Sequence, residues 1–429
     1  MAQGFDVTTP AARERAFLVG VSLPDSSVAR EEEYLEELQQ LALTAGAEVV
    51  GSAIQARTRI DGTTFIGSGK VGEIKRTCEE LGANLLIFDE DLSPAQARNL
   101  EKILGINVID RTELILDIFA RHAKTQQAKI QVELAQLQYA LPRLTRLWDH
   151  LSRQAGGMGL RGPGETQLEI DRRRIHQRMA HLRRALKKVS QRRATLREGR
   201  NGLPTAALIG YTNAGKSTLM RRLTGADAFV RDQLFATLDT MTRRIATRNH
   251  GDILVIDTVG FIRKLPNHLV TSFKATLEDT AQADLYLHVV DLSHPAYEEQ
   301  MQVTDATVRS IESARADTVY VFNKIDRLPA AELEGLRERY PDGVFISARH
   351  DEGIGVLRER IEEAFFGKNV HVEVKVSAGN GGTIAHLRRL LHHVKDAYEG
   401  DLCVLRGTIE SKMMGRLESV EGVEVRYLF

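Results

Sequence analysis

The sequence has very few cysteines and no long apolar run. Its 429 residues include two cysteines, Cys78 and Cys403, which lie far apart and have no CxxC partner. That pattern excludes a disulfide scaffold and a thiolate zinc cluster, and it fits a reducing cytoplasm. No stretch approaches the roughly 18 apolar residues of a membrane helix, and the start of the chain does not resemble a signal peptide. We therefore expect a cytoplasmic protein without a membrane span.

The sequence also lacks a net charge, but this balance conceals a strongly basic segment. Basic residues (Lys and Arg) and acidic residues (Asp and Glu) both number 58. Residues 121–200 nevertheless contain 19 basic and 6 acidic residues, and residues 172–197 contain 11 basic residues and no acidic one. The surface of a solvated coiled coil normally alternates bases with acids. A run without acids therefore favours binding to a polyanion such as RNA.

Length and composition predict several folded domains. The chain is 42% hydrophobic and 27% charged, as in globular proteins, and its length corresponds to about three domains of roughly 150 residues. Shifts in pattern divide it into four parts. These are an N-terminal α/β domain (1–111), a basic helical hairpin (112–200) with a glycine-rich tip (156–164), a nucleotide-binding domain (203–367) and a C-terminal α+β domain (369–429).

The N-terminal part alternates between strand-like and helix-like segments. Expected strands cover 16–23, 47–55, 85–89 and 106–109, and expected helices cover 31–45 and 94–104. Strands separated by helices predict a small βαβ domain with a mostly parallel sheet. The segment Gly67-Ser-Gly-Lys70 lacks the spacing of a phosphate-binding loop. We interpret it as a glycine turn into a helix that begins near Val71.

Two apolar seams predict the hairpin. The first seam, on one long helix, consists of Leu116, Phe119, Ala123, Gln126, Ile130, Leu134, Leu137, Leu141 and Leu144. Pro142 is expected to kink or end this helix. The second seam consists of Ile175, Met179, Leu182, Leu186 and Val189. A glycine-rich stretch joins the two, so the pattern predicts an antiparallel helical hairpin.

The strongest motif is a phosphate-binding loop. It follows an apolar strand (205–209), precedes a helix (218–224) and matches G-x-x-x-x-G-K-[ST] at every defined position. Its glycines let backbone N–H groups surround phosphates, its lysine reaches the β- and γ-phosphates, and its serine hydroxyl binds Mg²⁺. The expected nucleotide-binding residues here are Gly210, Tyr211, Thr212, Asn213, Ala214, Gly215, Lys216, Ser217 and Thr218.

A second motif, Asn323-Lys324-Ile325-Asp326, predicts guanine as the base. It follows a buried strand (318–322). The carboxylate of Asp326 can accept hydrogen bonds from both N1 and N2 of guanine, and adenine lacks these donors. Asn323 is expected to hold the loop, and Lys324 is expected to lie over the base.

Two further segments predict switches that sense the γ-phosphate. Thr237 offers a second hydroxyl to Mg²⁺, Asp257 would hold the ion through water, and the Gly260 N–H would meet the γ-phosphate. The expected switch residues are Phe235, Ala236, Thr237, Leu238 and Asp239 in the first segment and Asp257, Thr258, Val259 and Gly260 in the second. Lys216, Thr237 and Gly260 are the expected catalytic residues, and Ser217 and Thr237 the expected metal ligands.

The residue after the second switch motif predicts slow hydrolysis. A glutamine that orients water is common at this position, but here it is Phe261, whose ring cannot polarise water. Another residue or a bound partner must then complete the site.

The C-terminal part carries no chemical motif. Expected strands cover 370–376, 402–409 and 423–428, and expected helices cover 383–397 and 411–420.

These motifs and their order resemble one family of translation-factor-like GTPases, the HflX family. The resemblance covers essentially the whole chain. Its most specific part is the hairpin motif Gly164-Glu-Thr-Gln-Leu-Glu-Ile-Asp-Arg-Arg173, because other GTPases share the nucleotide motifs. It implies a cytoplasmic GTPase that binds the large ribosomal subunit and splits stalled or idle ribosomes under stress. We expect the protein to act as a monomer, although no feature of the sequence decides this. The hairpin would contact rRNA near the peptidyl-transferase centre, and the ribosome would stimulate GTP hydrolysis.

The resemblance also identifies a last guanine-binding loop and leaves some points open. Ser347, Ala348 and Arg349 occupy that loop, although the following His350 and Asp351 differ from the more usual Thr-Gly pair. The first switch reads Thr240-Met241 where the family usually has Pro-Thr, so the rigid proline turn is lost.

Asn213 matches a position that helps to bind K⁺ in potassium-stimulated GTPases, or it simply braces the loop. The family has also been associated with ATP hydrolysis and RNA unwinding, which Asp326 does not explain.

Two other functions compete with the ribosome hypothesis. The first is a GTPase that acts in ribosome assembly or RNA remodelling, which free RNA would stimulate. The second is an adaptor whose GTP state gates protein binding, which would show no RNA affinity. The basic hairpin argues against the adaptor, because binding that neutralises several phosphates weakens steeply with salt.

Overall fold

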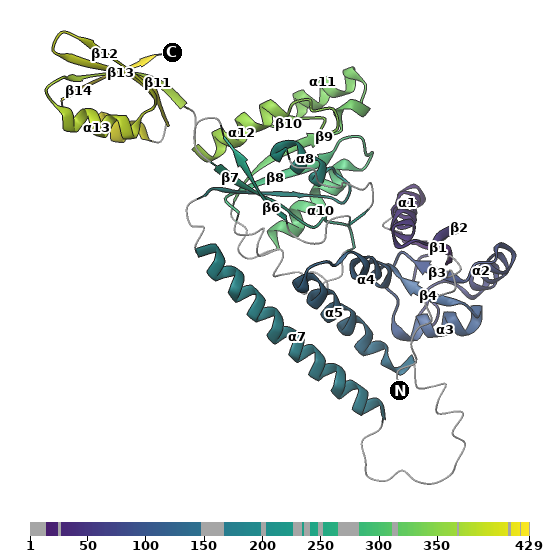
Figure 1. The fold of residues 1–429 in the computed structure, drawn as a ribbon. Helices are drawn as coiled ribbons and strands as arrows, with labels where there is room; N and C mark the ends of the chain where they lie inside the picture. The colour runs from purple at the N-terminus through teal and green to yellow at the C-terminus, as the bar shows by residue number, and fades with distance from the viewer. Residues whose placement is uncertain are drawn as a thin grey trace. The chain divides into compact units, whose positions relative to one another are not determined.

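The computed structural model describes most of the chain (Figure 1). The described residues are 14–24, 27–146, 167–198, 203–225, 234–235, 241–247, 252–264, 283–310, 316–366, 369–410, 413–420 and 422–428. Contacts divide the protein into two units. The first comprises Met1–Asn201, Val230–Thr240 and Val259–Glu278, and the second comprises Gly202–Phe229, Met241–Thr258 and Asp279–Phe429. Two stretches inside the predicted nucleotide-binding domain therefore group with the first unit. Among the described helices, none is long and apolar enough to cross a membrane.

The first unit contains a four-stranded parallel sheet, as the alternating pattern predicts. Its order is β2-β1-β3-β4, and the strands are β1 (Arg15–Ser22), β2 (Glu48–Ala56), β3 (Leu85–Phe88) and β4 (Asn107–Asp110). The helices are α1 (Val28–Ala45), α2 (Ser68–Leu81), α3 (Pro94–Leu104) and α4 (Arg111–His122). Helices α2 and α3 pack on one face of the sheet and α1 and α4 on the other (Figure 1).

Local sequence signals fix where these helices begin and end. The Ser27 hydroxyl accepts from the Arg30 N–H at the start of α1, and Gly46 ends that helix in the left-handed conformation at φ 90°. Gly67 precedes the first residue of α2. The Gly67–Lys70 segment leads into a helix as predicted, but the helix begins at Ser68, three residues before Val71. Lys70 therefore lies in its first turn and pairs with Glu73 at 2.6 Å.

The prediction of one long helix through residues 116–144 is wrong, because the chain breaks at Ala123. That residue adopts an extended ψ of 107°, and the Thr125 hydroxyl then caps a new helix by accepting from the Ala128 N–H at 3.2 Å. Leu116 and Phe119 are buried in α4, on the sheet of the first unit. The helix cap at Thr125 and the packing of α4 on the sheet outweigh the continuous 3-4 spacing of apolar residues along this stretch.

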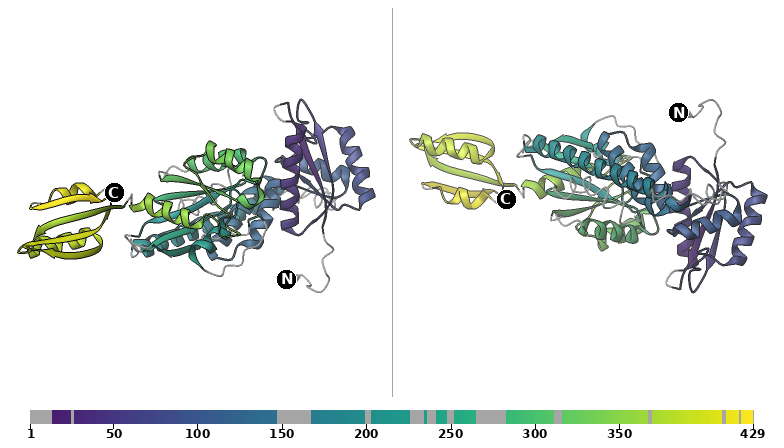
Figure 2. Two further views of the ribbon diagram at one scale, coloured as in Figure 1. Left: turned by 90° about the horizontal axis from the view of Figure 1, so that it is seen from above. Right: turned by 90° about the horizontal axis from the view of Figure 1, so that it is seen from below.

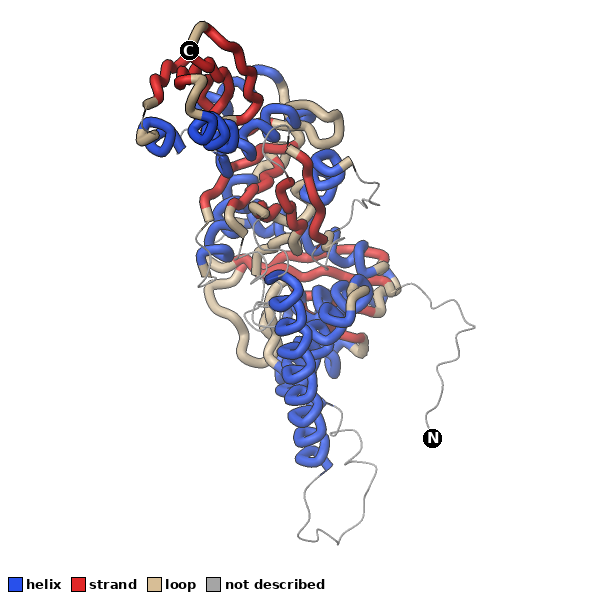
Figure 3. Tube along the Cα trace, turned by 60° about the vertical axis from the view of Figure 1, so that its left-hand side comes forward, coloured by secondary structure: helices blue, strands red, loops and turns tan. Residues whose placement is uncertain are grey.

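The hairpin itself is formed by α5 (Gln126–Ala140) and α7 (Gln167–Glu198), which lie side by side and antiparallel (Figures 1 and 3). Pro142 falls in a 3₁₀ helix, Leu141–Arg146, that ends α5. The apolar residues shared between the helices are Ile130, Leu134, Leu137, Leu141, Ile175, Met179, Leu182, Ala185 and Leu186. These are largely the two predicted seams. The glycine-rich tip, 156–164, lies outside the described residues.

The second unit contains a six-stranded sheet of order β10-β9-β8-β5-β7-β6. The strands are β5 (Thr205–Gly210), β6 (Met241–Ala246), β7 (Asp252–Asp257), β8 (Leu285–Asp291), β9 (Asp317–Asn323) and β10 (Val344–Phe345). All neighbours are parallel except β6, which runs antiparallel to β7 at the edge. The predicted mostly parallel P-loop fold is confirmed.

Helices cover both faces of this sheet. One face carries α8 (Lys216–Thr224) and α12 (Ile354–Phe366), and the other carries α10 (Tyr297–Arg309) and α11 (Ala330–Arg339). Helix α8 begins two residues earlier than the pattern predicts. Because both faces of the sheet are buried, β8 is mostly apolar and has six consecutive buried residues, with His288 among them. This arrangement places the carboxyl ends of β5, β7, β8 and β9 at one edge.

The C-terminal part forms a separate antiparallel sheet of order β12-β13-β11-β14 (Figures 1 and 2). Its elements are β11 (Asn369–Ser377), α13 (Gly381–Leu390), β12 (His392–Glu399), β13 (Leu402–Glu410), α14 (Met414–Glu418) and β14 (Val423–Leu428). The predicted helix over 383–397 is wrong in its second half. Residues from His392 onward pair with β13, because ladder hydrogen bonds outweigh local helix propensity.

Both cysteines are expected to resist thiol reagents in the folded protein. Cys78, on the buried face of α2, is 3% exposed, and Cys403 is fully buried in the C-terminal core. Burial also raises the pKa of the Cys78 thiol to about 11. At pH 8 only about one such thiol in a thousand is ionised. We expect labelling by a chromogenic disulfide reagent to require denaturant, with Cys403→Ala isolating the signal of Cys78. Rapid labelling in native buffer would contradict this burial.

Candidate nucleotide-binding site

Two glycines shape the loop between β5 and α8. Gly210 has a φ of 147°, and a Cβ there would lie 2.2 Å from the carbonyl oxygen of Val289. Gly215 has a φ of 97°, and its Cβ would lie 2.2 Å from the side-chain nitrogen of Asn323. No other residue fits these positions without moving backbone or a buried amide. The loop therefore needs glycine at both defined positions of the motif.

Lys216 is a buried cation at the first position of α8. It is 6% exposed, and its ammonium group donates to the carbonyl oxygens of Gly210, at 3.0 Å, and Tyr211, at 2.7 Å. Burial lowers its pKa to about 8, although Asp257 opposes the shift. These neutral carbonyls satisfy the hydrogen bonds of the ammonium group without neutralising its charge. The position therefore favours an anionic ligand.

Ser217 and Asp257 bring two oxygen groups together. The Ser217 hydroxyl donates to Asp257 Oδ2 at 2.7 Å, and Asp257 is 2% exposed at the end of β7. Hydroxyl and carboxylate oxygens are the ligands that Mg²⁺ prefers, so this pair fits that ion. Within the described structure, the buried hydroxyl of Thr212 has no hydrogen-bond partner. A buried orphan hydroxyl is costly, and a phosphate oxygen would offer it an acceptor.

Asn323 joins the phosphate loop to the loop after β10. Its amide nitrogen donates to the Ala214 carbonyl at 2.8 Å, and its amide oxygen accepts from the Ala348 N–H at 3.0 Å. Lys324 follows in the left-handed conformation, at φ 66°, and its ammonium group contacts Asp291 at 2.6 Å. The predicted holding role of Asn323 thus has a geometric basis.

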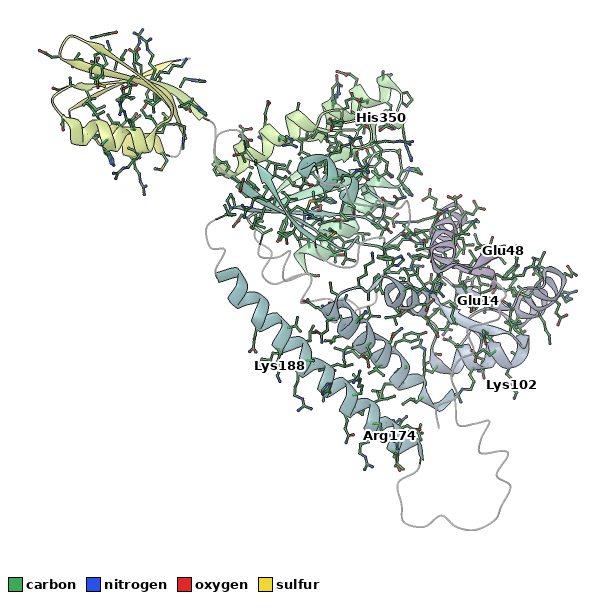
Figure 4. All side chains as sticks on the ribbon, viewed as in Figure 1. Glu14, Glu48, Lys102, Arg174, Lys188 and His350 are labelled. Atoms are coloured by element: carbon green, nitrogen blue, oxygen red, sulfur yellow. The ribbon has the colours of Figure 1, made fainter. Side chains whose placement is uncertain are left out.

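Asp326 presents an ionised carboxylate beside this loop. Its Oδ1 accepts from the Ser347 hydroxyl at 2.6 Å, and its Oδ2 lies 3.7 Å from Nε2 of His350, which Figure 4 labels. Burial alone would raise the pKa of Asp326, but the hydrogen bond from Ser347, together with His350 and Arg327, holds the pKa below its usual value. The carboxylate is therefore an acceptor throughout the neutral pH range.

Sequence reasoning missed two residues that support the base-binding loops. Arg222 on α8 donates to the carbonyl oxygens of Ala348, at 3.0 Å, and Arg349, at 2.6 Å. Asp291 fixes Lys324. Asp291 ends β8 at the carboxyl edge of the parallel sheet, where ligand sites gather, so its position was a usable signal. No sequence signal identifies Arg222, because its hydrogen-bond partners are backbone carbonyl oxygens, which every residue has.

The two predicted switch segments group mainly with the first unit, whereas the phosphate loop groups with the second. Ala236, Thr237, Leu238 and Asp239 lie outside the described residues. Phe235, which we expected at the nucleotide, is 3% exposed and forms an edge-on contact with Phe119 at 4.7 Å. It is therefore packed in the first unit. Val259 and Gly260 also group with that unit, whereas Lys216, Ser217, Asp257 and the Asn323–Asp326 motif group with the second.

Comparisons with known proteins agree with these motifs. Three family models match consecutive parts of the chain: GTP-binding GTPase N-terminal at residues 32–120, GTP-binding GTPase Middle Region at 122–200, and 50S ribosome-binding GTPase at 205–324. A crystal structure of a GTP-binding protein from Sulfolobus solfataricus with GDP is 24% identical. It covers 82% of this chain and 98% of its own, with a TM-score of 0.44.

Curated relatives align over nearly the whole chain. The GTPase HflX of Lacrimispora saccharolytica is 44% identical over 407 residues, which are 94% of this chain and 95% of the relative. The GTPase HflX of Magnetococcus marinus is 41% identical over 428 residues, or 98% of both chains. The family resemblance stated from the motifs is thereby confirmed, and this protein belongs to the HflX family of GTPases.

Proposed function

We propose that this protein binds the large ribosomal subunit in the cytoplasm as a monomer and uses GTP to split or rescue stalled or idle ribosomes under stress. The observation that carries the proposal is the basic surface of α7. Its exposed basic residues are Arg172, Arg173, Arg174, Arg178, Arg183, Arg184, Lys187 and Lys188. The family model described as a 50S ribosome-binding GTPase supports the choice of partner.

The packing of α7 explains why this surface suits RNA. Its apolar seam faces α5, so the basic side chains remain at the surface, where Figure 4 shows Arg174 and Lys188 projecting from the helix. Arg178 forms a two-point ion pair with Glu133, at 2.6 and 2.9 Å, which fixes α7 on α5. The remaining cations can neutralise RNA phosphates, which releases counterions. This supplies affinity that does not depend on the RNA sequence.

The loop geometry supports the proposed roles of Lys216 and Ser217, and the role of Thr237 rests on the sequence motif alone. Lys216 and the backbone N–H groups of the loop would hold the β- and γ-phosphates, and Ser217 and Thr237 would hold Mg²⁺, with Asp257 beside them. The ion supplies charge neutralisation at the transferred phosphoryl group when it is bound. Asn213, in the left-handed conformation at φ 61°, is the residue that would hold K⁺ if a monovalent cation binds.

Slow turnover by the isolated protein is part of the proposal. Phe261 is 3% exposed and offers no group that could orient water. A partner that completes the site is therefore expected to accelerate hydrolysis, as partners that supply missing groups do in other GTPases. The large ribosomal subunit is the partner that we propose.

The direct test is GTP turnover with and without purified large subunits. A clear stimulation, saturable in subunit concentration, is expected. Stimulation by free RNA or assembly intermediates but not by mature subunits would instead favour ribosome assembly or RNA remodelling. No RNA affinity and no effect of salt on binding would favour a nucleotide-gated protein adaptor.

Asp326→Asn is expected to change which nucleotide the protein binds. The amide nitrogen would face the N1–H and N2–H₂ donors of guanine, so GTP affinity should fall about 10²-fold or more. Xanthosine triphosphate carries a carbonyl at C2 and should bind the variant better than GTP does. Competition against a fluorescent GDP measures both affinities. The exposed Asp342→Asn is the matched control. Unchanged GTP affinity in Asp326→Asn would remove this residue from base recognition.

A further inference from the structure

Arg222 binds the loop after β10 through two consecutive backbone carbonyl groups. Its Nε donates to the Ala348 carbonyl oxygen at 3.0 Å, and its Nη2 donates to the Arg349 carbonyl oxygen at 2.6 Å. The guanidinium group holds its donors in a rigid planar fork, so these two bonds fix the orientation of two neighbouring peptide planes. Arg222 therefore constrains the backbone of this loop from outside it.

One of these peptide planes continues toward the carboxylate that is expected to bind guanine. In a trans peptide the carbonyl and the following N–H point in opposite directions. The bond from Arg222 to the Arg349 carbonyl thus directs the His350 N–H away from the guanidinium group. That N–H donates to the Ser347 hydroxyl oxygen at 3.2 Å, and the same hydroxyl donates to Asp326 Oδ1 at 2.6 Å. A continuous chain of polar contacts joins Arg222 to the Asp326 carboxylate.

Burial makes this loop dependent on partners within the protein. Ser347 is fully buried and Ala348 is 1% exposed, so water has little access to this part of the loop. Without the guanidinium group the Ala348 carbonyl would lose its donor, and an unpaired polar group in such a place is costly. We expect the loop to shift toward other donors in that case. Such a shift would move Ser347 and with it the hydrogen bond to Asp326.

Helix α12 holds Arg222 itself in place. Arg222 lies in the last turn of α8, which begins at Lys216. Nη2 of Arg358 on α12 donates to the carbonyl oxygens of Arg222, at 3.3 Å, and Leu223, at 2.7 Å. The last carbonyls of a helix lack partners within it, and a cation beside them also complements the helix dipole. Arg358 therefore stabilises the end of α8 from which Arg222 reaches the loop.

We propose that Arg222 is a positioning residue that orients the Asp326 carboxylate for guanine, and that Arg358 supports it from α12. Adenine lacks the N1–H and N2–H₂ donors that this carboxylate accepts, so only guanine nucleotides gain from its orientation. Arg222 thereby contributes to base selectivity and not to phosphate binding. This role depends on the predicted contact between Asp326 and guanine, and it is independent of the proposed action on ribosomes.

Arg222→Gln is expected to lower the affinities for GTP and GDP by the same factor, about tenfold. Both nucleotides carry the same base, so both lose the same orientation of Asp326. ATP engages only the phosphate loop, and its weak affinity should not change. The ratio of GTP to ATP affinity should therefore fall about tenfold. Competition of each nucleotide against a fluorescent GDP, on the full-length chain, measures this ratio.

Two further substitutions at the end of α8 make the test specific. Arg221→Gln is the matched control, because it removes the same charge from the preceding position of the same helix, and it should leave the ratio unchanged. Arg222→Lys keeps the charge but replaces the planar fork with one compact ammonium group. It should therefore restore only part of the GTP affinity.

Arg358→Gln tests the proposal independently if Arg222→Gln does not fold. It should lower the GTP to ATP ratio by a smaller factor. In the double variant the two losses should not multiply, because Arg358 acts through Arg222.

An unchanged ratio in Arg222→Gln, with Asp326→Asn still weakening GTP binding, would overturn the inference. Equal losses of GTP and ATP affinity would also overturn it, since they would show a general disturbance of the site. If Asp326→Asn left GTP affinity unchanged, base recognition by Asp326 would fail, and the role of Arg222 with it. The ribosome proposal would stand or fall separately, on stimulation by large subunits.

Discussion

Lys216→Ala is expected to reduce GTP turnover by about 10²- to 10³-fold. The side chain is buried and donates to the carbonyl oxygens of Gly210 and Tyr211, so the cation is already positioned in the loop. Alanine removes the positive charge that would meet the β- and γ-phosphates and leaves two carbonyl oxygens facing the phosphate. Both nucleotide affinity and the rate of the chemical step should fall, which single-turnover kinetics can separate.

The chain offers an internal control for this variant. Lys70 also follows a glycine and lies in the first turn of a helix, but its partner is Glu73, and the residues before it lack the P-loop spacing. Lys70→Ala should keep full turnover. If Lys216→Ala retained turnover, the reaction would not depend on this loop. Circular dichroism of both variants checks that the fold survives.

Neutralising the basic surface of α7 is expected to abolish stimulation by large ribosomal subunits. The change is Arg172, Arg173, Arg183 and Arg184 to Gln, four exposed residues on a helix anchored elsewhere by its apolar seam. If each contacts one phosphate, affinity for subunits should fall about 10²-fold or more. The slope of log affinity against log salt should become shallower by roughly three to four. Turnover without subunits should not change.

A charge-matched variant makes this test specific. Arg337, Arg339, Arg388 and Arg389 are exposed on α11 and α13, and their replacement by Gln removes the same total charge. That variant should keep most of the affinity and the original salt slope. An equal loss in both variants would mean that net charge, and not α7, drives the association. Pelleting through a sucrose cushion at several salt concentrations measures both quantities.

The sequence allowed the nucleotide-binding fold to be predicted because its motifs coincide with strand ends. Gly210 closes β5, Asp257 closes β7 and Asn323 closes β9. Parallel strands bring such ends to one edge, so the order of the motifs implied their proximity. The two errors in the helical regions have a different origin. The break at Ala123 and the strand from His392 depend on a cap and on a partner strand, which override an unbroken local pattern.

The ion pair between Glu37 and Arg263 could not be predicted from the sequence. Glu37 and Arg263 are separated by 226 positions, and neither belongs to a recognisable motif. Arg263 and Lys264 look like two ordinary surface cations after the Asp257–Gly260 motif. Only the folded chain shows that Arg263 is buried beside Glu37 and that Lys264 pairs with Asp89 and Glu90. The packing of Phe235 on Phe119 was equally hidden, because an aromatic residue in a loop is compatible with many neighbours.

The amide of Asn323 has a consequence for how the nucleotide is recognised. One side chain bonds to the phosphate loop through Ala214 and to the base loop through Ala348. The conformation of each loop therefore constrains the conformation of the other. A guanosine fragment and a pyrophosphate fragment, bound together, should each stabilise the arrangement that the other needs. The intact nucleotide carries both halves in one molecule. Its affinity should therefore exceed what the guanosine and pyrophosphate fragments provide separately.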